Sequence, residues 1–208
     1  MAVITISRQF GAGGRTIGKA IAEKLNYSFA DNEIIQSISE MANVSPAWVE
    51  SVEREAGTRL QRVISKVVSQ KWLDRVLSDE RGYIDEQIYL DYLVVIIAQV
   101  AEEDNVVVLG RGAQYILRDH PDAFHILLID EIENRIKFMM ENYDLPRSKA
   151  TQVVNNEDKR RLNLYRKLGK QDYDRPSLYH LVMNMSRLSI DKAVDLACEL
   201  IKGHQKVE

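Results

Sequence analysis

The sequence is poor in cysteine and contains no long apolar segment. Its 208 residues include one cysteine, Cys198, which excludes an intrachain disulfide and a cysteine metal cluster. The longest apolar run, residues 93–98, is far shorter than the ~20 residues that a membrane-spanning helix needs. The opening residues lack the basic and apolar regions of a signal peptide. We therefore expect a cytoplasmic protein that has no membrane partner.

The chain also lacks a strong net charge of either sign. Its 28 Lys and Arg residues against 31 Asp and Glu residues give a net charge of −3. This balance excludes a generally basic surface of the kind that binds long nucleic acids. Residues 147–175 are the exception, because they hold nine Lys or Arg residues against four acidic ones. A basic segment in a weakly acidic chain indicates a small polyanionic ligand.

Short apolar segments alternate with helical patterns along the chain. The expected strands are rich in β-branched residues and cover residues 2–6, 27–30, 105–109, 124–129 and 179–185. Residues 32–102 read as mostly helical, with a long amphipathic helix at 58–79 and a buried one at 89–100. Asp130 is expected to cap a later helix, and residues 190–201 form the last one. The alternation predicts a three-layer α/β fold with a parallel sheet of about five strands.

A glycine-rich segment joins the first expected strand to the first helix. It consists of Gly11, Ala12, Gly13, Gly14, Arg15 and Thr16. Backbone N–H groups surround phosphate closely where side chains are missing, and a helix N-terminus adds partial positive charge. In the phosphate-loop pattern G-x-x-x-x-G-K-[ST], Gly14 and Thr16 fit. Arg15 stands in place of the lysine, and Gln9 in place of the first glycine. The alternative is a tight strand-to-helix turn that holds no ligand.

Further segments match one family in the order of the chain. The loop reads G-A-G-G-R-T at residues 11–16, where cytidylate kinases read G-A-G-K-G-T. Residues 27–31 look like the family's short strand ending in Asp, and residues 106–112 like its strand followed by G-R-D. Residues 158–161 resemble the lid's D-x-x-R, and residues 184–191 the last strand and helix start. The chain thus resembles the cytidylate-kinase-like branch of the P-loop nucleoside monophosphate kinases over nearly its whole length.

This resemblance implies a single P-loop kinase domain with two additions. They are a helical monophosphate-binding insertion at about residues 32–102 and a lid at about residues 145–175. The implied reaction is phosphoryl transfer from ATP, with Mg²⁺, to a nucleoside monophosphate, CMP or dCMP being the first candidate. The implied partners are small-molecule nucleotides. The helices at 58–79 and 89–100 are candidates for a homodimer surface, although packing within one chain explains them equally well.

On the donor side, the resemblance assigns the phosphates of ATP to the backbone of residues 11–16 and to Arg15. Thr16 would bind Mg²⁺ through the nucleotide. Arg15, Arg160 and Arg161 would be the catalytic cations, because phosphoryl transfer needs alignment and positive charge around the reacting oxygens. The alternative for Arg160 and Arg161 is the solvated face of a helix, where ion pairs contribute little.

On the acceptor side, the resemblance implies that Arg111 and Asp31 bind the acceptor and that Asp158 supports the lid. Each residue has a structural alternative. Arg111 can form an ion pair with a neighbouring carboxylate, and Asp31 can cap a helix that begins at Asn32. Asp158 can be an i,i+3 partner on a helix surface instead of supporting the lid by pairing with an arginine.

Several positions depart from the cytidylate kinase pattern. The loop lacks its lysine, and Gly112 stands where G-R-D has its Asp. Val154 and Glu157 fall where basic lid residues are expected. These departures favour two alternatives: a nucleotide- or anion-binding module without efficient transfer, or a kinase of a non-nucleotide metabolite whose acceptor pocket Gly112 would widen. The histidines show no metal-ligand spacing with one another or with Cys198, so we expect no metal site beyond Mg²⁺.

Overall fold

One parallel sheet of five strands lies at the centre of the computed structural model, which describes residues 2–41, 46, 86–170 and 173–204. The strands are β1 (Val3–Arg8), β2 (Ser28–Ala30), β3 (Val106–Leu109), β4 (Ala123–Ile129) and β5 (Leu181–Asn184). Their order in the sheet is β2-β3-β1-β4-β5, and every pairing is parallel. The expected strands are confirmed, each with its ends shifted by no more than two residues.

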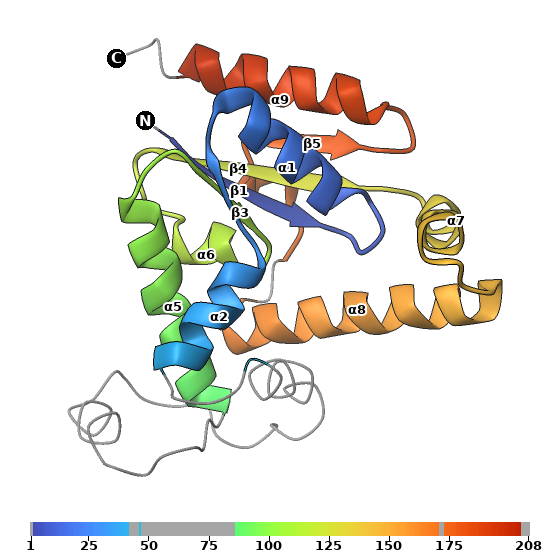
Figure 1. Ribbon diagram of the computed structural model, residues 1–208, viewed down its shortest axis with the longest axis horizontal. Coiled ribbons are helices and arrows are strands. Elements are labelled where there is room, and N and C mark those ends of the chain that lie inside the picture. The colour runs from blue at the N-terminus through green and yellow to red at the C-terminus, as the bar shows by residue number, and fades with distance from the viewer. Residues whose placement is uncertain (1, 42–45, 47–85, 171–172, 205–208) are drawn as a thin grey trace.

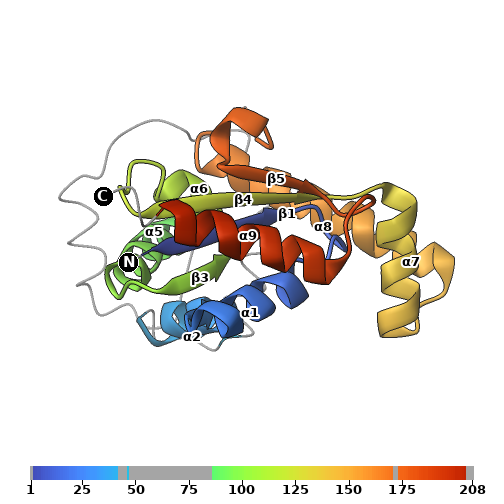
Figure 2. The same cartoon turned by 90° about the horizontal axis from the view of Figure 1, so that it is seen from above.

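Helices cover both faces of this sheet. They are α1 (Gly14–Leu25), α2 (Asn32–Met41), α5 (Glu86–Glu102), α6 (Ala113–Ile116), α7 (Ile132–Tyr143), α8 (Arg147–Lys167) and α9 (Ile190–His204). A 3₁₀ turn, Pro176–Leu178, precedes β5. In Figures 1 and 2, α1 and α9 lie on one face and α2, α5 and α6 on the other, while α7 lies beyond the carboxyl ends of the strands. The three-layer α/β fold is thus confirmed.

The strand side chains alternate between two apolar clusters. In β3, Val106 and Val108 pack with α2 and α5, whereas Val107 and Leu109 pack with α1 and α9. None of these four side chains is more than 2% exposed. Burial on both faces explains why the strands read in the sequence as continuous apolar runs and not as alternating ones.

The two ends of the expected helical insertion are helical, as α2 and α5. The expected helix at residues 58–79 lies outside the described residues. The apolar segment at 89–100 lies within α5, where Tyr89, Leu93 and Ile97 follow a four-residue spacing and are at most 1% exposed. Among the described helices, α5 included, none has the length and apolar character to cross a membrane.

The residue expected to cap α7 plays a different part. The N-cap position is Glu131, one residue later than predicted. The Asp130 carboxylate accepts hydrogen bonds from the Glu131 N–H at 2.8 Å and from the Asn134 amide at 3.1 Å. It also accepts one from the Ser186 hydroxyl at 2.7 Å. Asp130 therefore links the start of α7 to the segment between β5 and α9.

A histidine is buried within the sheet. His125 in β4 is 4% exposed, and its Nδ1 shares a hydrogen bond of 2.7 Å with the Thr5 hydroxyl of β1. Its backbone N–H donates to His180 Nδ1 at 3.0 Å. Burial, and to a smaller extent the nearby His180 and His120 rings, together lower the pKa of His125 to about 4. The folded protein therefore holds this ring in its neutral form.

We expect His125 to make folding stability fall as the pH drops from about 6.5 to about 4. In this window the unfolded imidazole binds a proton that the folded ring does not, and the full difference corresponds to about 3 kcal/mol. Urea unfolding of the wild type and of His125→Gln at pH 7.5 and 4.5 measures the effect. The variant should lose much of the pH dependence, whereas the control variant His120→Gln should keep it. Equal pH dependence in the wild type and His125→Gln would contradict the assignment.

Candidate active site

The loop between β1 and α1 has the conformation of an anion-binding turn. Gly11 and Gly13 have φ angles of 88° and 79°, in the left-handed region that glycine adopts without strain. Gly13 occupies the N-cap position of α1, and no side chain in the described part of the chain caps that helix. The N–H groups of the first helical turn are therefore available to an anion, which the helix dipole also favours.

A cavity of about 610 Å³ lies against this loop. The residues that line it from the loop and α1 are Gly11, Gly13, Gly14, Arg15, Thr16, Lys19, Ala20 and Glu23. Phe138, Met139 and Tyr143 of α7 form another side. Thr16 and Asp31 both line it and offer a hydroxyl and a carboxylate, oxygen ligands that suit Mg²⁺ when phosphate oxygens complete its shell. Within the described ranges, no three His, Cys, Asp or Glu side chains are grouped to hold a metal by themselves.

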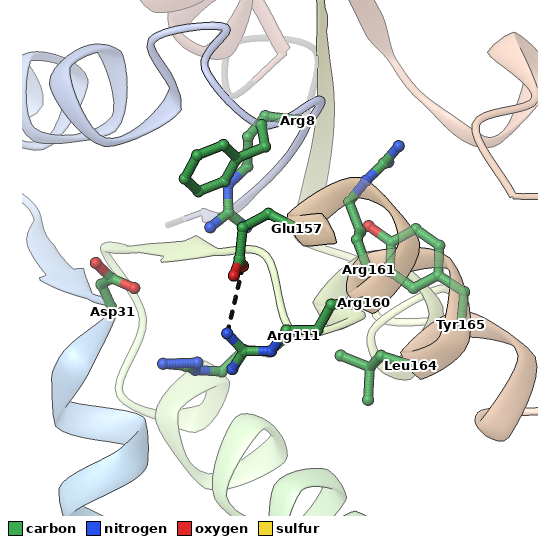
Figure 3. Close-up of a pocket in the computed structure, with 9 residues that line it drawn as sticks. Arg8, Asp31, Arg111, Glu157, Arg160, Arg161, Leu164 and Tyr165 are labelled. Carbon is green, nitrogen blue, oxygen red and sulfur yellow. Dashed lines mark hydrogen bonds and ion pairs between the residues drawn. The ribbon is translucent and has the colours of Figure 1, made fainter. Parts of the chain in front are cut away.

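A smaller cavity of about 160 Å³ adjoins the first. It is lined by Arg8, Phe10, Asp31, Arg111, Glu157, Arg160, Arg161, Leu164 and Tyr165. Figure 3 shows Arg8 at the end of β1, Arg111 in the turn after β3, and Glu157 and Arg160 of α8 around this space, whereas the Arg161 guanidinium points away from them. The fold thus brings Asp31, Arg111, Arg160 and Arg161, which the sequence placed in the acceptor site and the lid, around one space. Four arginines line this space against the carboxylates of Asp31 and Glu157, with Asp174 bound to Arg161 outside it, and the remaining excess of positive charge favours a small anion.

Arg15, predicted to replace the loop lysine, points toward the end of β2. Its Nε lies 3.5 Å from Asp31 Oδ2, and its side chain is 56% exposed. An ion pair this exposed contributes little stability. Asp31 directly precedes α2, and its side chain is 14% exposed. It lines both cavities, so it faces the candidate site even if it also caps α2.

The two lid arginines are fixed by carboxylates. Both terminal nitrogens of Arg161 donate to Asp174 at 2.7 Å, and this side chain is only 13% exposed. Burial alone would lower the pKa of Arg161, but the hydrogen bonds and charge of Asp174 outweigh it and raise the pKa. Arg160 lies 3.3 Å from Glu157. The solvated-face alternative is therefore wrong for Arg161.

Asp158 links α8 to the loop and to α7. Its Oδ1 accepts from the Phe10 N–H at 3.0 Å, and its Oδ2 accepts from Arg135 Nη1 at 2.6 Å. Arg135 Nη1 also donates to the Phe10 carbonyl at 3.2 Å. The prediction that Asp158 pairs with an arginine is confirmed, and the surface alternative is wrong. Arg135 was not identified from the sequence. The only feature in the sequence that could have indicated its burial is its position next to the apolar Ile136 in α7.

Two departures from the family pattern have structural explanations. Gly112 has a φ of 73°, and a Cβ there would overlap the Leu168 side chain. The expectation that Gly112 widens the acceptor pocket is therefore wrong, because Leu168 fills that space. Val154, where a basic lid residue was expected, is fully buried between α7 and α8 with Ile136 and Met139.

The sheet order and the glycine loop at the start of α1 define the class as P-loop kinases, and comparisons with known proteins agree. Residues 3–187 match the Cytidylate kinase-like family, to which the chain belongs. It is 27% identical over 141 residues to the shikimate kinase of Buchnera aphidicola subsp. Acyrthosiphon pisum, covering 65% of this chain and 79% of that protein.

Two solved structures share the fold at low sequence identity. An uncharacterized protein from Eubacterium ventriosum has a TM-score of 0.66 at 18% identity, covering 97% of this chain and 99% of its own. A shikimate kinase from Bacteroides thetaiotaomicron has a TM-score of 0.55 at 17% identity, covering 97% and 98%. These likenesses extend over nearly the whole chain and agree with the three-layer α/β architecture.

We expect Asp158→Ala to lower the free energy of unfolding by about 3 kcal/mol, because it leaves the buried Arg135 without its carboxylate. A second ion pair between α7 and α8, Arg147 with Glu133, has the same length of 2.6 Å but lies in solvent. Glu133→Ala should therefore cost less than about 1 kcal/mol. Urea unfolding of both variants makes the comparison. Equal losses would mean that burial does not distinguish the two pairs.

Proposed function

We propose that the chain is a Mg²⁺- and ATP-dependent kinase that phosphorylates a small anionic acceptor. The observation that carries this proposal is the pair of adjoining cavities, which share Arg8, Phe10 and Asp31. One cavity lies against an uncapped helix N-terminus and glycine loop, which suits the phosphates of ATP. The other is surrounded by arginines and suits the acceptor.

The chemistry required of these residues is mainly positioning and charge stabilisation. In the transfer, an acceptor oxygen bonds to the γ-phosphorus while the bond to the bridging oxygen breaks, and ADP leaves. Arg111, Arg160 and Arg161 surround the smaller cavity and would stabilise the charge on the transferring oxygens. Thr16 would hold Mg²⁺ at the phosphates, where the ion neutralises charge.

CMP or dCMP is the first candidate acceptor, supported by membership in the Cytidylate kinase-like family. Non-nucleotide acids are the second candidate, supported by the 27% identity to a shikimate kinase and by the small volume of the arginine-lined cavity. A carboxylate would bind the arginines as a phosphate does. The two acceptors differ in the oxygen that reacts, a phosphate oxygen in CMP and a hydroxyl in a hydroxy acid.

A coupled ADP-release assay with ATP and Mg²⁺ tests the proposal against all nucleoside monophosphates, dCMP and shikimate. We expect turnover with one of these anions and a loss of roughly 10²-fold or more in kcat/KM for Arg111→Ala. Arg118→Ala is the matched control, since Arg118 is exposed and lines neither cavity. Tight ATP binding without transfer to any acceptor would instead support a binding module, and unchanged turnover in Arg111→Ala would remove this residue from the site.

The Asp31→Asn variant separates the two kinds of acceptor. A hydroxyl acceptor must lose a proton, and Asp31 is the carboxylate that both cavities share. With a hydroxy acid we expect kcat to fall by roughly 10²- to 10⁴-fold. With a nucleoside monophosphate the fall should be much smaller, because the reacting phosphate oxygen carries no such proton. Glu157→Gln is the comparison, and a larger loss there would assign the base to Glu157.

A further inference from the structure

Two positions of the phosphate-loop pattern carry the opposite residue types in this chain: an arginine stands at a glycine position and a glycine at the lysine position. Taking Gly13 as the second glycine of G-x-x-x-x-G-K, the pattern places its first glycine at residue 8 and its lysine at residue 14. This chain has Arg8 and Gly14 at those positions, and Thr16 then lies two residues after the lysine position, as the threonine does in G-A-G-K-G-T. The structure supports this register, because Gly13 is the left-handed residue at the junction and α1 begins at Gly14.

The Arg8 side chain occupies the space beside Gly14. A Cβ built on Gly14 would lie 2.8 Å from Arg8 Cγ and 3.2 Å from its Cδ. Farther along the same side chain, a Cβ on Gly110 would overlap Arg8 Nη1. Arg8 therefore extends from the end of β1 past the first residue of α1 to the end of β3. Glycine at positions 14 and 110 leaves room for it, whereas a lysine at position 14 would collide with it.

The Arg8 guanidinium lies where the two cavities meet. Arg8 lines both cavities, whereas Arg15 lines only the larger one and faces Asp31. Figure 3 shows Arg8 entering the smaller cavity from the side of β1. Across the described residues, its guanidinium forms no hydrogen bond or ion pair. The phosphoryl group would pass this same junction on its way from donor to acceptor.

The electrostatic surroundings of Arg8 favour an anion. Burial is the main cause that lowers the pKa of Arg8. Tyr165 and Asp31 act in the opposite direction, and the charges of Arg111 and Arg161 lower the pKa by smaller amounts. An arginine nevertheless stays charged in a protein. A cation that is partly desolvated beside two others gains from an anionic ligand, and its planar donors can contact two phosphate oxygens at once.

We propose that Arg8 supplies the phosphate-binding cation of this loop, in place of a lysine at position 14 and instead of Arg15. The assignment deepens the proposed function and rests on it, since it names the residue that binds the donor phosphates where they meet the acceptor. The assignment also explains why residue 14 is a glycine, because the Arg8 side chain reaches the loop from β1 through the space that a side chain at position 14 would occupy.

Calorimetry with ATP and Mg²⁺, without any acceptor, tests the assignment. Arg8→Met should weaken ATP binding by about 10- to 100-fold, the loss expected for charge-assisted hydrogen bonds. Arg15→Met should lose less, and Arg118→Met should bind as the wild type does. The double variant Arg8→Gly/Gly14→Lys moves the cation to the standard position and should recover most of the lost affinity. Three results would each overturn the Arg8 assignment: equal ATP affinity in Arg8→Met and the wild type, a larger loss of affinity in Arg15→Met than in Arg8→Met, or a wild type that does not bind ATP.

Thermal unfolding of each variant separates loss of binding from loss of folding. If Arg8→Met does not fold, the double variant Arg8→Gly/Gly14→Lys tests the assignment in its place. A double variant that folds but does not bind ATP overturns the assignment. Failure of the Arg8 assignment can be distinguished from failure of the proposed kinase function. A wild type that binds ATP through Arg8 but phosphorylates no acceptor contradicts the kinase proposal alone, whereas transfer that is unaffected in Arg8→Met contradicts the Arg8 assignment alone.

Discussion

The carboxylate of Asp158 is the contact on which the geometry of the candidate site depends. It binds the Phe10 N–H within the glycine loop and the Arg135 guanidinium of α7, so one side chain of α8 fixes two other segments. The pair is largely buried, and a buried charge without its partner costs several kcal/mol, so this arrangement is strongly preferred over a separated one. Because α8 also carries Arg160 and Arg161, the same contact sets the distance between the loop and the lid cations.

Glycines shape this site in a way that differs from the usual explanation of a phosphate-binding loop. Gly11 and Gly13 adopt left-handed conformations that bend the loop. Gly14 and Gly110 instead leave room for Arg8, and Gly112 leaves room for Leu168. Three glycines thus accommodate side chains of the protein itself. The result is a compact cavity with charged groups at its wall, and not an enlarged acceptor pocket.

Much of the fold could be predicted from the sequence, because strands covered on both faces are mainly apolar, as in β3 and, apart from His125, in β4. The loop was equally visible through its glycines. Its register was ambiguous by one residue, and counting from Gly14 directed attention to Arg15, whereas the structure brings Arg8 against the loop. Arg135 resembled an ordinary charge on an amphipathic helix. Both arginines are defined by contacts between distant segments, which local patterns do not encode.

The backbone at Arg111 contributes to the direction in which this cation points. Gly110, Arg111 and Gly112 have φ angles of 72°, 51° and 73°, so three successive residues are left-handed. For the two glycines this conformation is unstrained, but for Arg111 it costs of order 1–3 kcal/mol. A strand that ended in ordinary geometry would send this side chain in another direction. The strained turn instead directs it into the cavity that Arg8 enters from β1, so that the two cations approach one space from neighbouring strands. Backbone strain at Arg111 is therefore the cost of placing charge at the carboxyl ends of the sheet, where an anionic acceptor would bind.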